Sequence, residues 1–345
     1  MITYRLIEPD DSPALESIMA ASPDAGLVQF SYDYCHDLIA VHQALAADLR
    51  GVVAACENSL VGMLFGDLHP VQWAGQVHQA VYVSNLRVCP DHRRQGIAGG
   101  MAQWGLDYLE DQLGGDFLMY GAIMEANISL TLAQRYGFQS SAPIQGGTVP
   151  MRKKPPRLRP DLIVRLAREE DLGVIANYMN DFYRDYDLWS PVEPAGLSKF
   201  INQQVGGVRP NQLYVAARGR QILAGLSLSD RTGLIRMQIE RAPLVVRALG
   251  GLIGILPRSG LLKALTVRRV WFKEGELQAG RYLWQQLRYQ LRRRADCLGI
   301  AYDPHSPLAQ LFQTPFWLPM FKARYLVRSA SPPSDSRFIY CLAGP

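Results

Sequence analysis

The chain has 345 residues, 48% of them hydrophobic and 19% charged, a composition typical of globular proteins that excludes a disordered chain. Its net charge of +5 favours small anionic partners and is too weak to indicate nucleic-acid binding. The cysteines are widely separated and form no CxxC pair, and no two histidines have ligand spacing, which argues against a disulfide framework and a metal site. The acidic N-terminus argues against a signal peptide, and the lack of a long apolar run argues against a membrane span. We therefore expect a cytoplasmic protein.

Two stretches of the chain repeat the same pattern. In the segments that begin at Arg5 and Arg165, an aspartate follows the arginine by six residues and a methionine follows it by fourteen. Each segment is typical of a strand, an acidic N-cap and an amphipathic helix. The segments 52–64 and 214–228 then both read as a strand, a polar turn and a second strand, with a glycine at the matching place. The repeated spacing predicts a duplicated α/β unit.

A basic, proline-rich linker separates the two predicted copies. The segment 151–162 carries three prolines and five Lys and Arg residues, so it can continue neither a helix nor a central strand. We therefore expect a first domain at 1–152 and a second at 161–345.

The stretch 92–100, HRRQGIAGG, places basic side chains directly before a cluster of glycine and alanine residues. A β-branched and aromatic strand at 81–88 precedes it. Apolar residues at helical spacing follow from Ile97, until Gly114-Gly115 ends the helix. The stretch is thus predicted to be the turn at a helix N-terminus, where backbone N–H groups lack intrahelical partners and the helix dipole is positive.

Small side chains at this turn would let a phosphate reach the helix N–H groups. Gly96 and Ala98 leave the backbone open, and Arg93 and Arg94 add charge-assisted donors. The turn therefore predicts a pyrophosphate site; the alternative is an ordinary tight connection between strand and helix.

The motif here resembles that of the GCN5-related N-acetyltransferase (GNAT) superfamily. The family's acetyl-CoA loop reads Val-x-Pro, then Gln/Arg-x-x-Gly-x-Gly/Ala; this chain has Val88-Cys89-Pro90, then Arg93 to Ala98. The resemblance covers the first copy, including the AQRYGFQ segment at 133–139. It implies an α/β fold (an α+β mixed sheet), with two tandem GNAT-like domains, each a central, mostly antiparallel mixed sheet flanked by helices. It also implies acetyl-CoA as cosubstrate, no metal, and a small-molecule or peptide amine as acceptor.

The resemblance assigns cofactor contacts residue by residue. The strand end would bind the pantetheine arm, the turn would bind the pyrophosphate, and a splay between the fourth strand and a fifth strand at about 116–123 would admit the thioester. The residues expected to bind acetyl-CoA are Leu86, Arg87, Val88, Arg93, Arg94, Gln95, Gly96, Ile97, Ala98, Gly99 and Asn127.

The catalytic groups depart from the family pattern. The usual acid, a tyrosine, falls on Ala133 when counted back from Gly137, and Asn127 sits one residue closer to Gly137 than the common spacing. Tyr136 would share a helix face with Ala133, so it is the candidate acid; the alternative is that it packs beside Phe138. The frequent acidic base is replaced by Asn85, so a water chain is the expected route for the proton.

The second copy is expected to be degenerate. The segment 241–267 is apolar and glycine-broken and predicts a buried helix pair, with a substrate lid or a lipid-facing helix as alternatives. The segment 267–294 predicts the fourth strand and its helix, with Gly275 where the loop needs arginine and Gln278 where it needs glycine. This copy is therefore not expected to bind acetyl-CoA in the usual way.

Two functions remain open from the sequence. One is an N-acetyltransferase that moves an acetyl group from acetyl-CoA to an amine in the first domain. The other is a non-catalytic acyl-CoA-binding or regulatory GNAT-like protein, because no acid or base stands out. The sequence does not identify the acceptor, because the fold alone does not define it. The loops expected to select the acceptor, at 22–37 and 68–79, are of a variable kind.

Overall fold

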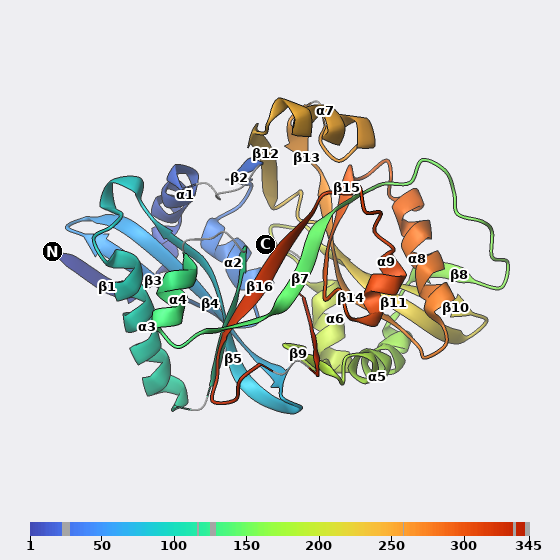
Figure 1. Cartoon of the computed structure of the whole chain (residues 1–345), viewed down its shortest axis with the longest axis horizontal. Coiled ribbons are helices and arrows are strands. Elements are labelled where there is room, and N and C mark those ends of the chain that lie inside the picture. The colour runs from blue at the N-terminus through green and yellow to red at the C-terminus, as the bar shows by residue number, and fades with distance from the viewer. Residues whose placement is uncertain (23–27, 116, 125–128, 258, 334–335, 342–345) are drawn as a thin grey trace.

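The computed structural model describes residues 1–22, 28–115, 117–124, 129–257, 259–333 and 336–341. A 12-stranded mixed sheet forms its centre (Figure 1). In spatial order the strands are β1 (Ile2–Leu6), β3 (Leu49–Cys56), β4 (Ser59–Trp73), β5 (Gln76–Val88), β6 (Leu118–Met124), β16 (Met320–Arg328), β7 (Gln139–Pro150), β15 (Cys297–Tyr302), β14 (Ala264–Phe272), β11 (Gln221–Ser229), β10 (Asn211–Arg218) and β8 (Ile163–Leu166).

Helices cover both faces of this sheet. They are α1 (Ser12–Ala21), α2 (Leu38–Leu45), α3 (Ile97–Leu113), α4 (Ser129–Arg135), α5 (Leu172–Phe182), α6 (Pro194–Asn202), α7 (Leu244–Ile253), α8 (Leu277–Gln290) and α9 (Pro307–Phe312). Two small sheets add β13 (Leu261–Leu262), β12 (Ile235–Arg241) and β2 (Gln29–Tyr34), and β17 (Phe338–Ile339) with β9 (Tyr186–Asp187). None of the described helices is long and apolar enough to cross a lipid bilayer.

The repeated arginine and aspartate spacing corresponds to the same local structure in both halves. Arg5 donates two hydrogen bonds of 2.7 Å to the carboxylate of Asp11, which also accepts the backbone N–H of Glu8. Arg165 donates two hydrogen bonds of 2.5 and 3.0 Å to Asp171, which likewise accepts a backbone N–H three residues before it. Each pair fixes the passage from an edge strand into the following helix.

The two halves exchange strands at the centre of the sheet. Strand β16 lies between β6 and β7, and it pairs antiparallel with both. Strand β7 in turn lies between β16 and β15. The two strands cross the middle of the molecule side by side (Figure 1). Strand β16 of the second half thus completes the hydrogen bonding of β6 in the first half, and β7 of the first half completes that of β15 in the second.

The linker begins directly after the exchanged strand β7. The carbonyl of Pro150 accepts two hydrogen bonds from the guanidinium of Arg288 on α8, and the Arg152 N–H donates to the carbonyl of the same arginine. The linker is therefore held at its start against the second half.

Alternating side chains give the first half two distinct faces. Helix α3 packs Ile97 and Met101 against Val52 and Ala54 on one face. Helices α1 and α2 pack on the other face, where Phe65 is buried. Side chains two residues apart in a strand share a face, so Asp67 and His69 follow Phe65 on the face opposite α3. We call this the α1/α2 face.

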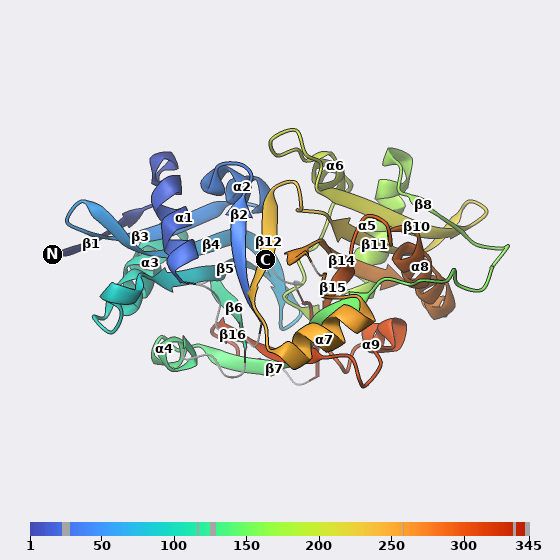
Figure 2. The ribbon, with the colours of Figure 1, turned by 90° about the horizontal axis from the view of Figure 1, so that it is seen from above.

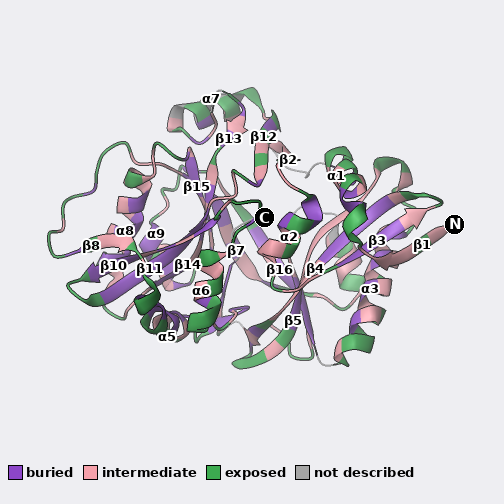
Figure 3. Ribbon diagram, turned by 180° about the vertical axis from the view of Figure 1, so that it is seen from behind, coloured by how far each residue is buried: buried purple, intermediate pink, exposed green. Residues whose placement is uncertain are grey.

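The α1/α2 face looks toward the second half. Strand β2 pairs with β12 between the halves (Figure 2), and Val41 of α2 packs with Val205 and Leu234. The strands of the large sheet are buried between helices whose outer sides are exposed (Figure 3).

The prediction of a buried helix pair at 241–267 is wrong. The segment forms one helix, α7, whose Leu244 is 83% exposed, followed by β13 and the start of β14. Gly254 adopts a left-handed φ of 80° and ends the helix, as glycine commonly does. An apolar run does not by itself distinguish a helix from a strand.

Candidate active site

The turn between β5 and α3 is built from backbone that faces open space. After β5, a short 3₁₀ turn at Pro90–His92 leads to Arg94 and Gly96, which both have positive φ, of 63° and 79°. A Cβ placed on Gly96 would meet no atom within 4 Å. The first helical hydrogen bond of α3 runs from the Gly100 N–H to the Gly96 carbonyl, so the N–H groups just before it lie outside the helical ladder.

This geometry fits a pyrophosphate. Alternating positive φ turns successive N–H groups toward one concave side, and the helix dipole adds positive potential there. Arg94 and Gln95 are exposed beside the turn, whereas the side chain of Ile97 is 2% exposed and anchors the helix in the core. The backbone of Ile97, Ala98 and Gly99, rather than their side chains, is what this turn offers to a phosphate.

Arg93 has a different partner from the one expected. Its guanidinium donates to the carbonyl of Val88 and to the hydroxyl of Ser22, both at 3.1 Å. Arg87 donates to the carbonyl of the same serine. These two arginines tie the end of β5 to the end of α1, so in this structure they position the turn rather than project from it.

Strand β5 is kinked where the resemblance expects the thioester. The register with β4 shifts between Met63 and Phe65, and Asn85 on the bulged strand has a φ of 52°. The parallel ladder between β5 and β6 runs only from Ala80–Leu118 to Tyr82–Tyr120, although both strands continue beyond it. The two strands therefore part after these tyrosines, next to the bulge at Leu86.

A polar network lies at the point where the strands part. The hydroxyl of Tyr120 is 2.7 Å from Nε2 of His69, and Nδ1 of His69 is 3.5 Å from the carboxylate of Asp67. The other carboxylate oxygen of Asp67 accepts the N–H groups of Ala47 and Asp48 at 2.8 and 3.1 Å, which fixes its orientation. Burial raises the pKa of Tyr120 well above its usual value.

Tyr82 packs beside this network. It is the register partner of Asp67, and its ring centroid is 5.2 Å from that of Tyr120. Asp67, His69, Tyr82 and Tyr120 thus share the α1/α2 face, on the side opposite α3, and a hydrogen bond joins Tyr120 to His69. Sequence reasoning missed all four, and the only local signal was the alternation of polar residues at positions 67 and 69.

Comparison with known proteins agrees with this geometry. Residues 15–138 match the profile described as the Acetyltransferase (GNAT) family. The first half contains a GNAT domain. No curated protein has a significantly similar sequence.

Solved structures share the fold over nearly the whole chain. A GCN5-related N-acetyltransferase from Sphaerobacter thermophilus matches 97% of each chain at a TM-score of 0.59 and 15% identity. A GCN5-related N-acetyltransferase from Anabaena variabilis matches over 96% of this chain and 73% of its own chain, with a TM-score of 0.55 and 13% sequence identity. Saccharomyces cerevisiae N-myristoyltransferase with bound myristoyl-CoA matches over 96% of this chain and 83% of its own chain, with a TM-score of 0.65 and 9% sequence identity. At these identities the likeness shows the fold alone.

Tyr136 lies beside the start of α3 in the GNAT domain. Its hydroxyl donates to the carbonyl of Gly99 at 2.8 Å. It follows α4 directly and does not lie at the parting of β5 and β6 with Tyr120. Asn127, the other expected residue of this region, is outside the described residues.

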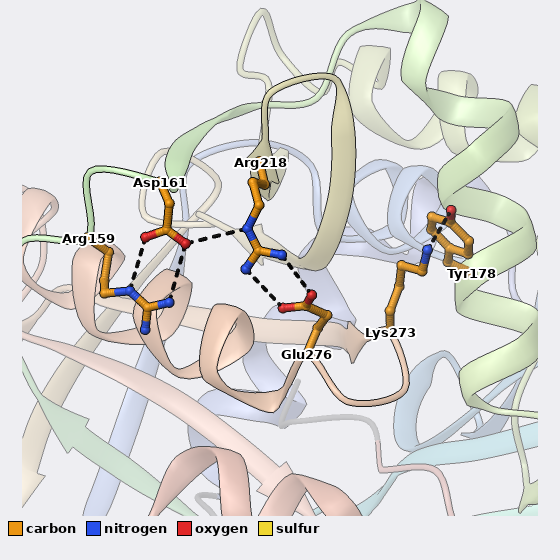
Figure 4. A network of polar contacts seen from close by, with 6 residues as sticks. All are labelled: Arg159, Asp161, Tyr178, Arg218, Lys273 and Glu276. Atoms are coloured by element: carbon orange, nitrogen blue, oxygen red, sulfur yellow. Dashed lines mark hydrogen bonds and ion pairs between the residues drawn. The ribbon is translucent and has the colours of Figure 1, made fainter.

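The corresponding turn of the second half carries acids. Strand β14 has the same irregularity as β5, with a register shift against β11 and a φ of 50° at Arg269. Its turn, however, runs from Lys273 through Gly275 to Glu276 at the start of α8. The carboxylate of Glu276 accepts hydrogen bonds of 3.0 and 3.4 Å from Arg218 (Figure 4).

The remaining contacts at this turn are also internal. Arg218 contacts Asp161, which pairs with Arg159, and Lys273 donates to the hydroxyl of Tyr178 (Figure 4). A Cβ on Gly280 would lie 2.9 Å from Leu311, so this glycine allows α9 to pack against α8. A carboxylate at the helix N-terminus repels a phosphate, and the arginine beside it is already paired.

Proposed function

We propose that the protein is an N-acetyltransferase that moves an acetyl group from acetyl-CoA to an amine, with the chemistry in residues 1–152. The observation that carries the proposal is the open turn at Gly96, placed between a bulged strand and a helix N-terminus. The GNAT match over 15–138 and the fold shared with N-acyltransferases support it. The five free cysteines suit a reducing compartment, and we assign the activity to the cytoplasm.

The residues of the GNAT domain divide into a binding part and a proton-transfer part. The backbone of Leu86 to Val88 would pair with the pantetheine arm, and Arg94 to Gly99 would line the pyrophosphate. His69, whose Nδ1 lies 3.5 Å from the Asp67 carboxylate, is the proposed acceptor of the amine proton, through Tyr120 or directly. Tyr136 remains the candidate acid toward the thiolate, and its hydroxyl must first leave the Gly99 carbonyl.

We further propose that residues 161–345 are a second GNAT-like domain without an acetyl-CoA site. The matching Arg165–Asp171 pair and the bulge at Arg269 support a common origin of the two halves. Glu276 lies at the turn of the second half that corresponds to the open turn at Gly96, and its carboxylate supports the loss of a phosphate site there. The chain would then bind one acetyl-CoA.

The test uses the full chain with acetyl-CoA and a panel of amines, and it measures released CoA together with calorimetric stoichiometry. We expect turnover with at least one amine and one acetyl-CoA per chain. Binding without any turnover would favour the non-catalytic alternative, and a stoichiometry near two would refute the loss of the second site.

A further inference from the structure

The second half forms part of the surroundings of Tyr120. Strand β6 lies between β5 of the GNAT domain and β16 of the second half. The ladder between β6 and β5 ends at the Tyr82–Tyr120 pair, whereas the ladder between β6 and β16 continues as far as Met124. Beyond the point where β5 and β6 part, β6 is therefore held by a strand of the second half.

Tyr325 of β16 contacts Tyr120 directly. It is the register partner of Ala122, two residues from Tyr120 on β6, so the two tyrosine side chains share the α1/α2 face. Their ring centroids are 5.9 Å apart, within the range of favourable contacts between aromatic rings. Tyr325 is 0% exposed and belongs to the same core cluster as Tyr120. Because the Tyr82 ring contacts Tyr120 from β5, the Tyr120 ring has a tyrosine neighbour on each of the strands that flank β6.

A β-bulge lies beside Tyr325. The register between β16 and β7 shifts between Arg324 and Leu326, so that Ser141 and Ala142 of β7 both oppose Tyr325. The Tyr325 N–H donates to the side-chain hydroxyl of Ser141 at 3.0 Å, and Ser141 is buried. Bulges redirect side chains and are frequent next to active sites. The backbone of β16 is therefore fixed at the residue whose ring contacts Tyr120.

The second half also holds the strand that carries His69. On β4, Gln72 makes two backbone hydrogen bonds of 2.7 Å with the segment that follows β9: its N–H donates to the Trp189 carbonyl, and its carbonyl accepts the Leu188 N–H. Leu188 is buried in the same core cluster as Tyr120. Both strands that carry the His69–Tyr120 hydrogen bond are thus hydrogen-bonded to residues of the second half.

We propose that Tyr325 is a positioning residue for acetyl transfer, whose ring holds Tyr120 with its hydroxyl at Nε2 of His69. The hydroxyl is 2.7 Å from that nitrogen, and proton transfer requires a separation of about 2.6–3.2 Å. Loss of the Tyr325 ring would leave a cavity beside Tyr120, into which the Tyr120 ring could move away from His69. This inference rests on the proposed function, in which His69 accepts the amine proton, and it makes the chemistry of the GNAT domain depend on the second half.

The first experiment removes the Tyr325 ring and then restores it. Tyr325→Leu should lower kcat at least about tenfold and leave the acetyl-CoA Kd within about threefold, because the change affects the proton-transfer groups and not the turn at Gly96. Tyr325→Phe keeps the ring and should retain kcat within about threefold of the native value. The matched control is Leu326→Ala, because Leu326 is also buried on β16 but lies on the opposite face. An equal loss in Leu326→Ala or in Tyr325→Phe would contradict positioning by the ring.

A double-mutant cycle shows whether Tyr325 acts through Tyr120. Tyr120→Phe removes the hydroxyl that contacts His69 and should lower kcat at least as much as Tyr325→Leu does. The double variant should then have the kcat of Tyr120→Phe within about threefold, because residues that act as a unit have non-additive effects. If the two losses multiply in the double variant, Tyr325 does not act through Tyr120 and the proposal is wrong.

A third measurement does not depend on turnover, so it separates this inference from the proposed function. The full chain is labelled with ¹⁵N at its six histidines, and the NMR signals of the His69 ring are identified by their loss in His69→Gln. These signals report the hydrogen bonds of the two ring nitrogens. Tyr325→Leu and Tyr120→Phe should both shift them, whereas Tyr325→Phe and Leu326→Ala should not.

The outcomes of the NMR measurement are distinct. Unshifted His69 signals in Tyr325→Leu would refute the positioning role even if the native chain acetylates an amine. Shifted signals in a chain that acetylates no amine would instead refute the proposed function. If Tyr325→Leu does not fold, Ser141→Ala takes its place, because it removes the hydroxyl that accepts the Tyr325 N–H; it should shift the same signals, and unshifted signals would count against the proposal.

Discussion

Gly96 allows the phosphate site to be tested by charge alone. Its φ of 79° is unfavourable for most side chains, but asparagine and aspartate tolerate this region. The two residues have the same shape, and a Cβ at this position meets no atom within 4 Å. Gly96→Asn and Gly96→Asp therefore share any backbone cost, of about 1 kcal/mol, and differ by one negative charge.

The magnitude follows from Coulomb's law. At a separation of about 6 Å and an effective dielectric constant of about 20, two unit charges repel by about 3 kcal/mol. This corresponds to roughly a 100-fold loss of affinity. The same carboxylate at the start of α3 is favourable for the helix by about 0.5 kcal/mol, so the aspartate variant should be at least as stable as the asparagine variant.

Calorimetry of acetyl-CoA binding and thermal unfolding separate these effects. We expect Gly96→Asp to bind about 100-fold more weakly than Gly96→Asn at low salt, with a smaller difference at high salt because of screening, and with equal or higher Tm. If the two variants bind acetyl-CoA within threefold of each other, the pyrophosphate does not lie at this turn.

Three further predictions concern single side chains. His69→Gln should lower kcat at least about 100-fold with an unchanged acetyl-CoA Kd, whereas His78→Gln on β5 serves as a control; a kcat within threefold of the native value excludes His69 as the proton acceptor. Tyr136→Phe should lower kcat at least about tenfold if the hydroxyl protonates the thiolate, and an unchanged kcat would leave it only its hydrogen bond to the Gly99 carbonyl. The pKa of His42 is lowered from 6.5 to about 4 in the folded protein, so folding favours the neutral imidazole. Its contribution to the free energy of unfolding is therefore complete above pH 6.5, and about 3 kcal/mol of that free energy is lost as the pH falls toward 4. Urea unfolding at pH 7 and pH 4.5 should show this loss in the native chain and a smaller one in His42→Gln, and equal losses would contradict it.

The parts of the site that the sequence predicts are local. The turn at 92–100 is marked by small residues and cations between a strand and a helix, and helix α3 begins and ends at the predicted residues, Ile97 and Leu113. The Arg5–Asp11 spacing is similarly contained within a few residues. Such patterns reflect backbone preferences that act over one or two turns.

The rest depends on register between distant strands. Asp67 meets Tyr82 only through the pairing of β4 with β5, and His69 meets Tyr120 across a further strand. The exchange of β7 and β16 is equally hidden, because β7 contains Pro143 and Gly146-Gly147, which are not typical of a central strand.

The exchanged strands impose an order on synthesis. Strand β6 ends at Met124, but the neighbour that lies beside it, β16, begins at Met320, so roughly 200 residues must be added before this edge can pair. At about 5–20 residues per second, a ribosome needs about 10–40 s for that length. During this interval β6 presents an unpaired edge, which is the kind of surface that promotes association with other chains. The nascent first half would therefore depend on chaperones or rapid elongation until the last strands emerge.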